Sequence, residues 1–256
     1  MMANFIYSRV TIEPQEAMDK ICDMIDNMPQ VNYGEETKVV VQTFYTEEEI
    51  NRPYNNGQTE YPITDTGVMH GWLYDNVGTK WITVGVDDDI RIDSPSYIPD
   101  GFLVKLFSIC CEDFDDVSLE CRWYDETETQ CGFAMISDGI YAEDEEYLSD
   151  EAISDPAYEV TGDEDIDDVK EWLLSQVNED SYTKPSEIQE MEEDDLRDLF
   201  QDWKSQDKWD YMSDAQDGMR DSCIEAIETR DFQFPVSKVK RIANRRFKML
   251  ENSYPF

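Results

Sequence analysis

Residues 5–28 read FIYSRVTIEPQEAMDKICDMIDNM, and the hydrophobic period changes at Pro14. Before Pro14, a run rich in β-branched and aromatic residues is typical of a β-strand. After it, apolar residues recur at helical spacing, at Ala17, Ile21, Met24, Ile25 and Met28. Proline is tolerated in the first turn of a helix. The sequence therefore predicts a strand followed directly by an amphipathic helix.

The same alternation of strand and helix signals continues to about residue 140. Residues 38–45 fit either a strand or the start of a helix. Further strands are predicted at 81–86, 90–93, 117–124 and 132–136, with a helix at 98–109. The order β-α-variable-β-β-α-β-β predicts an α+β fold, with a ferredoxin-like antiparallel sheet that carries its helices on one face.

The second half of the chain changes to helical patterns within an acidic background. Four apolar stripes at helical spacing lie within residues 166–177, 186–203, 213–229 and 237–250. The second stripe begins with a capping-box signature, Ser186 followed by Gln189. We therefore predict three regions, which are a ferredoxin-like domain at 1–145, an acidic linker at 146–163 and an acidic, mainly helical domain at 164–256.

The charge of the chain restricts its partners. It has 60 Asp and Glu against 21 Lys and Arg, which gives a formal net charge of −39. Such a surface repels phosphate, so it argues against direct nucleic-acid binding by the protein as a whole and against anionic membranes. The sequence shows neither a signal peptide nor a membrane-spanning run, and its six cysteines form no Cys-x-x-Cys pair. We expect a cytoplasmic protein with reduced, buried cysteines.

Residues 72–81 read Trp-Leu-Tyr-Asp-Asn-Val-Gly-Thr-Lys-Trp, and an opening strand that contains Asn4 precedes them. With the strand, Pro-containing loop, helix and two strands from 90 to 140, this segment resembles the YubB-like proteins of phages and plasmids. In that family Trp-Gly is usual where this chain has Val77-Gly78. The resemblance implies a ferredoxin-like N-terminal domain, a phage or mobile-element origin and a bacterial host cell. It implies no catalytic residue.

The sequence offers no recognisable active site. His70 is the only histidine, and a single His is more often structural than catalytic. One His and scattered Cys supply too few ligands for zinc. Residues 163–174 fail the calcium-loop pattern, because Asp168 and Leu174 stand where Gly and Glu are required. No Gly-rich phosphate loop occurs. We therefore predict a non-enzymatic protein without metal or cofactor.

Clustered acids are the candidate binding residues. The spacing of acids along a helix approaches the charge density of DNA, which carries one charge per roughly 1.7 Å of axis, while a helix rises about 1.5 Å per residue. The sequence thus predicts a phage-encoded inhibitor that mimics DNA and binds a basic host protein such as a nuclease, a restriction or defence complex, or a polymerase. The predicted contact residues are Asp163, Glu164, Asp165, Asp167, Asp168, Glu192, Glu193, Asp194, Asp195 and Asp198. The alternative is a phage structural or assembly protein whose acidity serves solubility.

The C-terminus reverses the trend. Residues 230–256 hold seven basic and two acidic residues. A predicted helix there carries Lys238, Lys240, Arg241, Arg245, Arg246 and Lys248. It either binds nucleic acid, which is the minor possibility, or docks against the acidic surface of the protein itself. A homo-oligomer is also compatible with the sequence.

Overall fold

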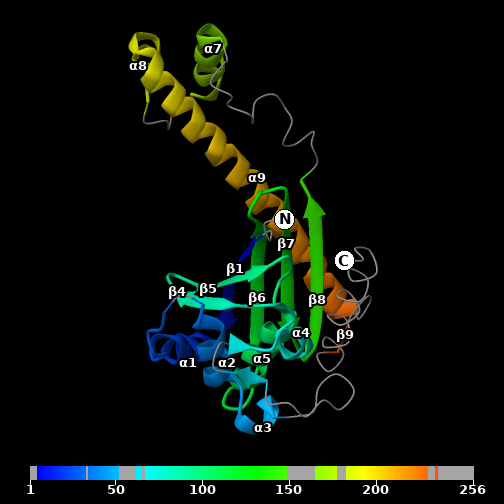
Figure 1. The fold of residues 1–256 in the computed structure, drawn as a ribbon. Helices are drawn as coiled ribbons and strands as arrows, with labels where there is room; N and C mark the ends of the chain where they lie inside the picture. The colour runs from blue at the N-terminus through cyan, green and yellow to red at the C-terminus, as the bar shows by residue number, and fades with distance from the viewer. Residues whose placement is uncertain are drawn as a thin grey trace, which may run out of the picture. The chain divides into compact units, whose positions relative to one another are not determined.

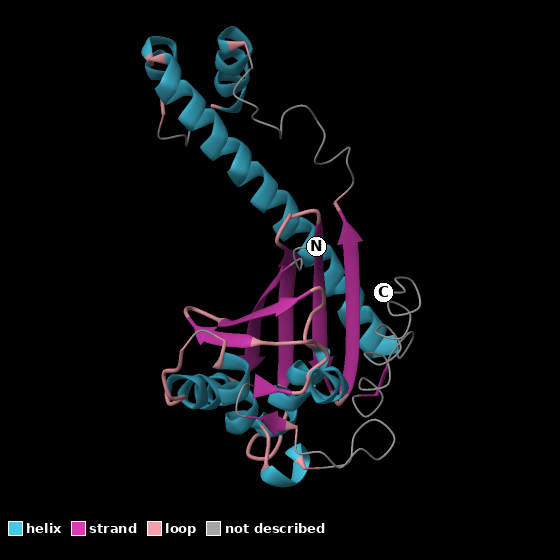
Figure 2. Cartoon of the chain, in the orientation of Figure 1, coloured by secondary structure: helices cyan, strands magenta, loops and turns pink. Residues whose placement is uncertain are grey.

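The computed structural model describes residues 5–32, 34–51, 62–64, 67–148, 165–177, 183–229 and 234–235. The protein is α+β, with an antiparallel sheet and helices (Figures 1 and 2). Its contacts divide the chain into two units. We call Met1–Tyr147 with Gln216–Phe256 the sheet unit, and Leu148–Ala215 the helical unit.

The main sheet has the strand order β4-β5-β1-β6-β7-β8-β9, and every neighbouring pair is antiparallel. In this order β5 lies between β4 and β1, and β1 lies between β5 and β6. Two β-α-β segments are thereby interleaved. The strands are β1 (Phe5–Glu13), β4 (Thr83–Val86), β5 (Ile90–Pro95), β6 (Ser118–Asp125), β7 (Gln130–Ser137), β8 (Ile140–Tyr147) and β9 (Phe234–Pro235). A separate hairpin joins β2 (Ile63–Thr64) to β3 (Gly67–Val68).

One face of the sheet buries the main apolar core. Alternate residues of β1 point into it, including Ile6, Val10 and Ile12, because side chains alternate between the faces of a strand. Residues 38–45 prove to be mostly helical and contribute Val40 and Phe44. Helices on this side include α1 (Gln15–Asp26), α2 (Glu36–Phe44), α3 (Glu47–Ile50), α4 (His70–Asn76) and α5 (Asp100–Cys110).

The opposite face of β6 and β7 is covered by the C-terminal part of α9 (Glu193–Thr229). Arg220 pairs with Glu120 at 2.7 Å, and Arg122 pairs with Asp217 at 2.6 Å. Glu120 and Arg122 alternate along β6 with residues that face the main core, so they lie on the other side. Helices therefore pack on both faces, whereas the sequence predicted them on one face only.

Strand β8 was missed in the sequence because Glu143–Glu146 have low β propensity. It pairs with β7 over its full length, from Ile140 against Ser137 to Tyr147 against Gln130. The predicted linker at 146–163 therefore begins inside this strand. Its residues from 149 onward lie outside the described part of the chain.

The predicted helical domain at 164–256 is also divided differently. Residues 193–229 form one helix, because no proline interrupts them and the segment 204–212 also favours helix. Its first part, to Ala215, belongs to the helical unit together with α7 (Ile166–Gln176) and α8 (Pro185–Glu190). The capping residue of α8 is Lys184 rather than Ser186, and Pro185 occupies the first turn. The fourth predicted stripe, 237–250, lies outside the described residues.

Gly132 is required by the packing of Trp123. The two residues are directly opposite on β7 and β6, and an added Cβ at Gly132 would overlap the Trp123 ring. We expect Gly132→Ala to destabilise the protein by about 1–3 kcal/mol, the usual cost of overpacking. Urea unfolding followed by circular dichroism measures the difference.

Gly218→Ala is the matched control for this substitution. Gly218 lies in α9 with no heavy atom within 4 Å of an added Cβ. Because alanine favours helix over glycine by about 0.5–1 kcal/mol, this variant should be slightly more stable than wild type. Equal stability of both variants would contradict the packing role of Gly132.

Candidate interaction surface

His70 is exposed at the start of α4, and no group of three or more His, Cys, Asp or Glu side chains among the described residues could hold a metal ion. Burial raises the pKa of the Cys121 and Cys223 thiols to about 12, so these thiols stay protonated near neutrality. Cys110 and Cys131 are also buried, but Cys111 is exposed, in contrast to the expectation that every cysteine is buried.

Two residues of the segment 72–81, Trp72 and Gly78, have a role in packing the fold. Trp72 is fully buried, and its ring meets Tyr45 edge to face with centroids 5.1 Å apart. Gly78 has a φ of +96°, and a Cβ there would overlap the Asp100 carboxylate. Glycine is therefore needed for both the turn and the close approach.

The helical unit is built around an apolar cluster from α7, α8 and α9. Its buried members are Val169, Leu173, Ile188, Leu196 and Phe200. Trp172 and Phe200 meet edge to face at 5.0 Å, and the Lys204 Nζ lies 4.0 Å from the centre of the Trp172 ring. Lys204 is only 6% exposed. One of the few cations of this unit is thus held inside it against an aromatic face.

Three of the acids predicted near α7 lie at the start of that helix. Asp165 is the N-cap residue, and its carboxylate accepts a hydrogen bond from the Asp167 backbone N–H at 2.9 Å. Asp167 and Asp168 lie in the first turn, where negative charge interacts favourably with the helix dipole. All three are exposed. Asp163 and Glu164 lie outside the described residues. The α7 acids therefore have a structural explanation besides any binding role.

The acids predicted near α9 are exposed as well. Glu193, Asp194 and Asp195 lie in its first turn, and Glu192 precedes it. Arg197 pairs with Glu193 at 2.8 Å, so Glu193 is partly neutralised. Asp198 lies beyond the first turn, where the interaction of a negative charge with the helix dipole is weaker. The dipole therefore does not account for an acid at this position.

Asp202, which the sequence reasoning missed, continues the pattern of Asp195 and Asp198. These three residues follow one another at i, i+3 and i+7, so they share one side of α9, and all three are exposed. We call them the α9 acidic row. The helical period applied to the charged residues, rather than to the apolar ones, would have identified it.

The charge density of the first ten residues of α9 is close to that of a nucleic acid strand. Residues 193–202 hold five acids and one arginine. Ten helical residues span about 15 Å, so one net charge falls about every 4 Å, against about 3.4 Å along one strand of DNA. Over the described residues of the helical unit, fifteen acids face five basic residues. The surface is therefore suited to a strongly basic partner.

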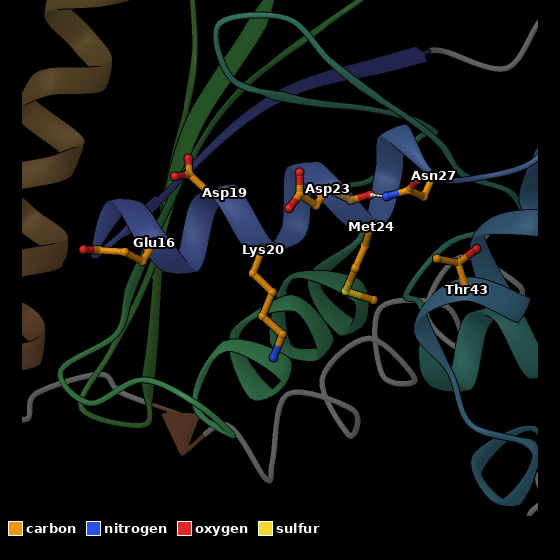
Figure 3. Close-up of a pocket in the computed structure, with 7 residues that line it drawn as sticks. All are labelled: Glu16, Asp19, Lys20, Asp23, Met24, Asn27 and Thr43. Carbon is orange, nitrogen blue, oxygen red and sulfur yellow. Dashed lines mark hydrogen bonds between the residues drawn. The ribbon is translucent and has the colours of Figure 1, made fainter.

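A second acidic surface lies on the sheet unit. An open pocket of about 730 Å³ lies along α1 and reaches Thr43 of α2 (Figure 3). Glu16, Asp19 and Asp23 line it at i, i+3 and i+7. The Lys20 Nζ donates to the Asp113 carboxylate at 2.6 Å and to the Ile109 carbonyl at 2.9 Å, so this cation is already engaged. Three of the residues that line the pocket are thus carboxylates on the exposed side of α1, which need no catalytic or metal-binding role to explain them.

Comparison with protein-family models, with curated proteins and with solved structures found no match. Among the described helices, none is both long enough and apolar enough to cross a membrane.

Lys204 gives a test of how the helical unit is held together. We expect Lys204→Ala to destabilise this unit by about 1–2 kcal/mol, because it removes both the cation over Trp172 and the packing of the lysine stem. Hydrogen exchange of the α7 amides in the full chain measures the loss as faster exchange. Lys204→Met, which keeps an apolar stem, should fall between wild type and Lys204→Ala.

Lys170→Ala serves as the control on α7, where the lysine is partly exposed. Its effect should stay within about 0.5 kcal/mol, as for most surface substitutions. If Lys204→Ala exchanged no faster than Lys170→Ala, the buried cation would not stabilise the unit.

Proposed function

We propose that this protein is a non-enzymatic inhibitor that binds a basic, nucleic-acid-handling protein through the acidic surface of its helical unit. The observation that carries the proposal is the α9 acidic row, in which Asp195, Asp198 and Asp202 are exposed on one side of a helix. A basic groove that accepts DNA would attract such a row over a long range, and the association would weaken with salt.

The position of the cations supports this surface as the binding one. Lys204 is buried within the unit, and Arg197 lies on Glu193. Asp195, Asp198 and Asp202 are exposed, so the α9 acidic row presents its negative charge to solvent.

The assembly alternative would require an exposed apolar patch. Large exposed apolar side chains among the described residues are Val31, Tyr147, Trp209 and Tyr211. Val31 lies in the loop after α1, and Tyr147 is the last residue of β8. Trp209 and Tyr211 are two residues apart on a helix, so they point in different directions. This distribution favours the inhibitor over the assembly protein.

We further propose that the sheet unit is a ferredoxin-like domain extended by β7, β8 and β9. The strand order β4-β5-β1-β6 supports this assignment, because it interleaves the segment from β1 through α1 to β4 with the segment from β5 through α5 to β6. The elements α2, α3, β2, β3 and α4 are inserted between α1 and β4. A phage origin and a bacterial host remain predictions from the resemblance, and the cytoplasmic location remains a prediction from the sequence patterns.

The first experiment is affinity capture from a bacterial lysate at low and at high salt, followed by mass spectrometry. We expect one nucleic-acid-processing protein to be retained at low salt and released at high salt. The captured protein is then purified, and its DNA binding is measured with increasing amounts of the chain. Competition with DNA is the expected result, because both ligands would occupy the same basic groove.

Matched variants test the surface itself. Asp195→Asn, Asp198→Asn and Asp202→Asn together should weaken the competition at least about tenfold, since loss of roughly 1.4 kcal/mol corresponds to that factor. The control is the triple variant Glu16→Gln, Asp19→Asn and Asp23→Asn. These three acids lie on α1 of the sheet unit with the same spacing, and the variant removes the same number of charges. If the two triple variants weakened the competition equally, the effect would be one of overall charge, and the α9 acidic row would not be the contact surface.

A further inference from the structure

Four aromatic rings of the sheet unit contact one another outside the main core. Phe5 and Tyr7 are two residues apart on β1, so their side chains lie on one face of the sheet. Their ring centroids are 6.4 Å apart. The Trp81 ring lies 5.2 Å from the Phe5 ring, and the Tyr124 ring lies 5.4 Å from the Tyr7 ring. All four rings are partly exposed, and none belongs to the main apolar cluster. We call these four residues the aromatic ladder.

Three arginines lie beside the aromatic ladder on the same face. Arg9 follows Tyr7 by two residues on β1. Directly opposite Arg9 are Arg91 of β5 and Arg122 of β6. Like charges directly opposite each other destabilise a sheet, yet three of the ten arginines of the chain are placed in this way. We call them the arginine row, and the stability of the sheet does not explain it.

Acidic side chains orient the arginine row without covering it. One carboxylate oxygen of Asp87 accepts from Arg9 at 3.2 Å and from Arg91 at 3.3 Å. Asp217 pairs with Arg122 at 2.6 Å. The arginine side chains are nevertheless 45%, 48% and 38% exposed, in the order Arg9, Arg91 and Arg122. Exposed ion pairs contribute little to stability, so another anion can join or replace these carboxylates at small cost.

The face that carries the ladder and the row is covered at one side only. Phe133 of β7 is opposite Arg122 in the register and is fully buried, and the Cys223 thiol of α9 donates to its carbonyl. Arg9 and Arg91 continue the same register line onto β1 and β5, where both are exposed. In the part of the chain that the structure describes, α9 therefore leaves this side of the face accessible.

Rings and guanidinium groups in this arrangement match the two parts of a nucleotide. Aromatic rings stack on unpaired bases of any sequence, and arginine binds phosphate through two parallel hydrogen bonds. Side chains two residues apart on a strand are separated by about 7 Å, so a base over Tyr7 has its phosphate near Arg9. A duplex fits less well, because its bases are already paired and stacked on one another.

From these observations we infer that the aromatic ladder and the arginine row bind a short stretch of single-stranded nucleic acid. The bases stack on the rings, and the phosphates meet the arginines. The site covers a small part of the surface, so it agrees with the repulsion of nucleic acid by the chain as a whole. Charges farther away than about 8 Å are largely screened at physiological salt. The inference does not depend on the partner proposed for the α9 acidic row.

The first test is photocrosslinking of the purified full chain to a short single-stranded oligonucleotide that carries bromouracil. Peptide mapping then locates the adducts, which we expect at Phe5, Tyr7, Trp81 or Tyr124. The same oligonucleotide annealed to its complement should give far fewer adducts. Adducts mainly in the basic segment 236–256, or equal yields with single strand and duplex, would overturn the inference.

A pair of variants tests the rings. Tyr7→Leu with Tyr124→Leu keeps apolar side chains but removes two stacking surfaces. Binding of a labelled single strand, measured by fluorescence anisotropy, should weaken at least about tenfold, as expected for the loss of one stacked base. The control is Tyr147→Leu with Tyr211→Leu, which removes two exposed tyrosines outside the ladder and should bind like wild type. Circular dichroism checks the fold, and if the first variant unfolds, the crosslinked positions in the unchanged chain decide.

A second pair tests the arginines. Arg9→Gln with Arg91→Gln should also weaken binding of the single strand at least about tenfold, because two phosphate contacts are lost. The control is Lys170→Gln with Lys184→Gln, which removes the same charge from the helical unit. Equal weakening by the two variants would show that overall charge, and not the arginine row, governs binding.

Two further outcomes would overturn the inference. One is the absence of any binding of the single strand at low salt. The other is displacement of the labelled strand by polyglutamate as readily as by unlabelled oligonucleotide. That result would mean that the face binds acidic peptides and other anions without contacting bases.

Discussion

Repulsion between carboxylates is the constraint under which every part of this chain packs. Basic residues are scarce, and several of them lie where elements meet. Arg220 and Arg122 connect α9 to β6, while Lys105 lies 2.8 Å from both carboxylate oxygens of Glu49 and joins α5 to α3. An exposed ion pair usually contributes only about 0–1 kcal/mol. In a chain with this net charge, such pairs act mainly by offsetting like-charge repulsion at the contacts between elements.

Physical chemistry accounts for the positions of many of the described acids. Acids in the first turns of α7 and α9 interact with the helix dipole. The acids Glu143–Glu146 lie on β8, near the edge of the sheet, where charge opposes pairing with other chains. The α9 acidic row is neither a helix cap, apart from Asp195, nor a strand edge. Its exposure and spacing are therefore the best basis for a binding function.

The two units differ in the size of their apolar cores. In the sheet unit, β7 is buried on both faces over residues 131–134, because the main core covers one side and the end of α9 the other. The helical unit has a smaller apolar cluster around Trp172 and Phe200 and a densely acidic exterior. A small core stabilises modestly, so a buried lysine against an aromatic ring contributes noticeably there.

The sequence by itself determined the α+β class, the strand and helix at residues 5–26, and the acidic, mainly helical character of the region from 166 to 229. These follow from local hydrophobic period and composition, which need no tertiary contact. Only the tertiary structure decided that Glu143–Glu146 form a strand, since the ladder with β7 overrides their low β propensity. It also decided that α9 contributes residues to both units, to the helical unit up to Ala215 and to the sheet unit from Gln216. Which face of a helix is buried depends on its neighbours in the fold. The α9 acidic row lies within the predicted helical stripe at 186–203, but Asp202 was missed because the helical period was applied to the apolar residues and not to the charged ones.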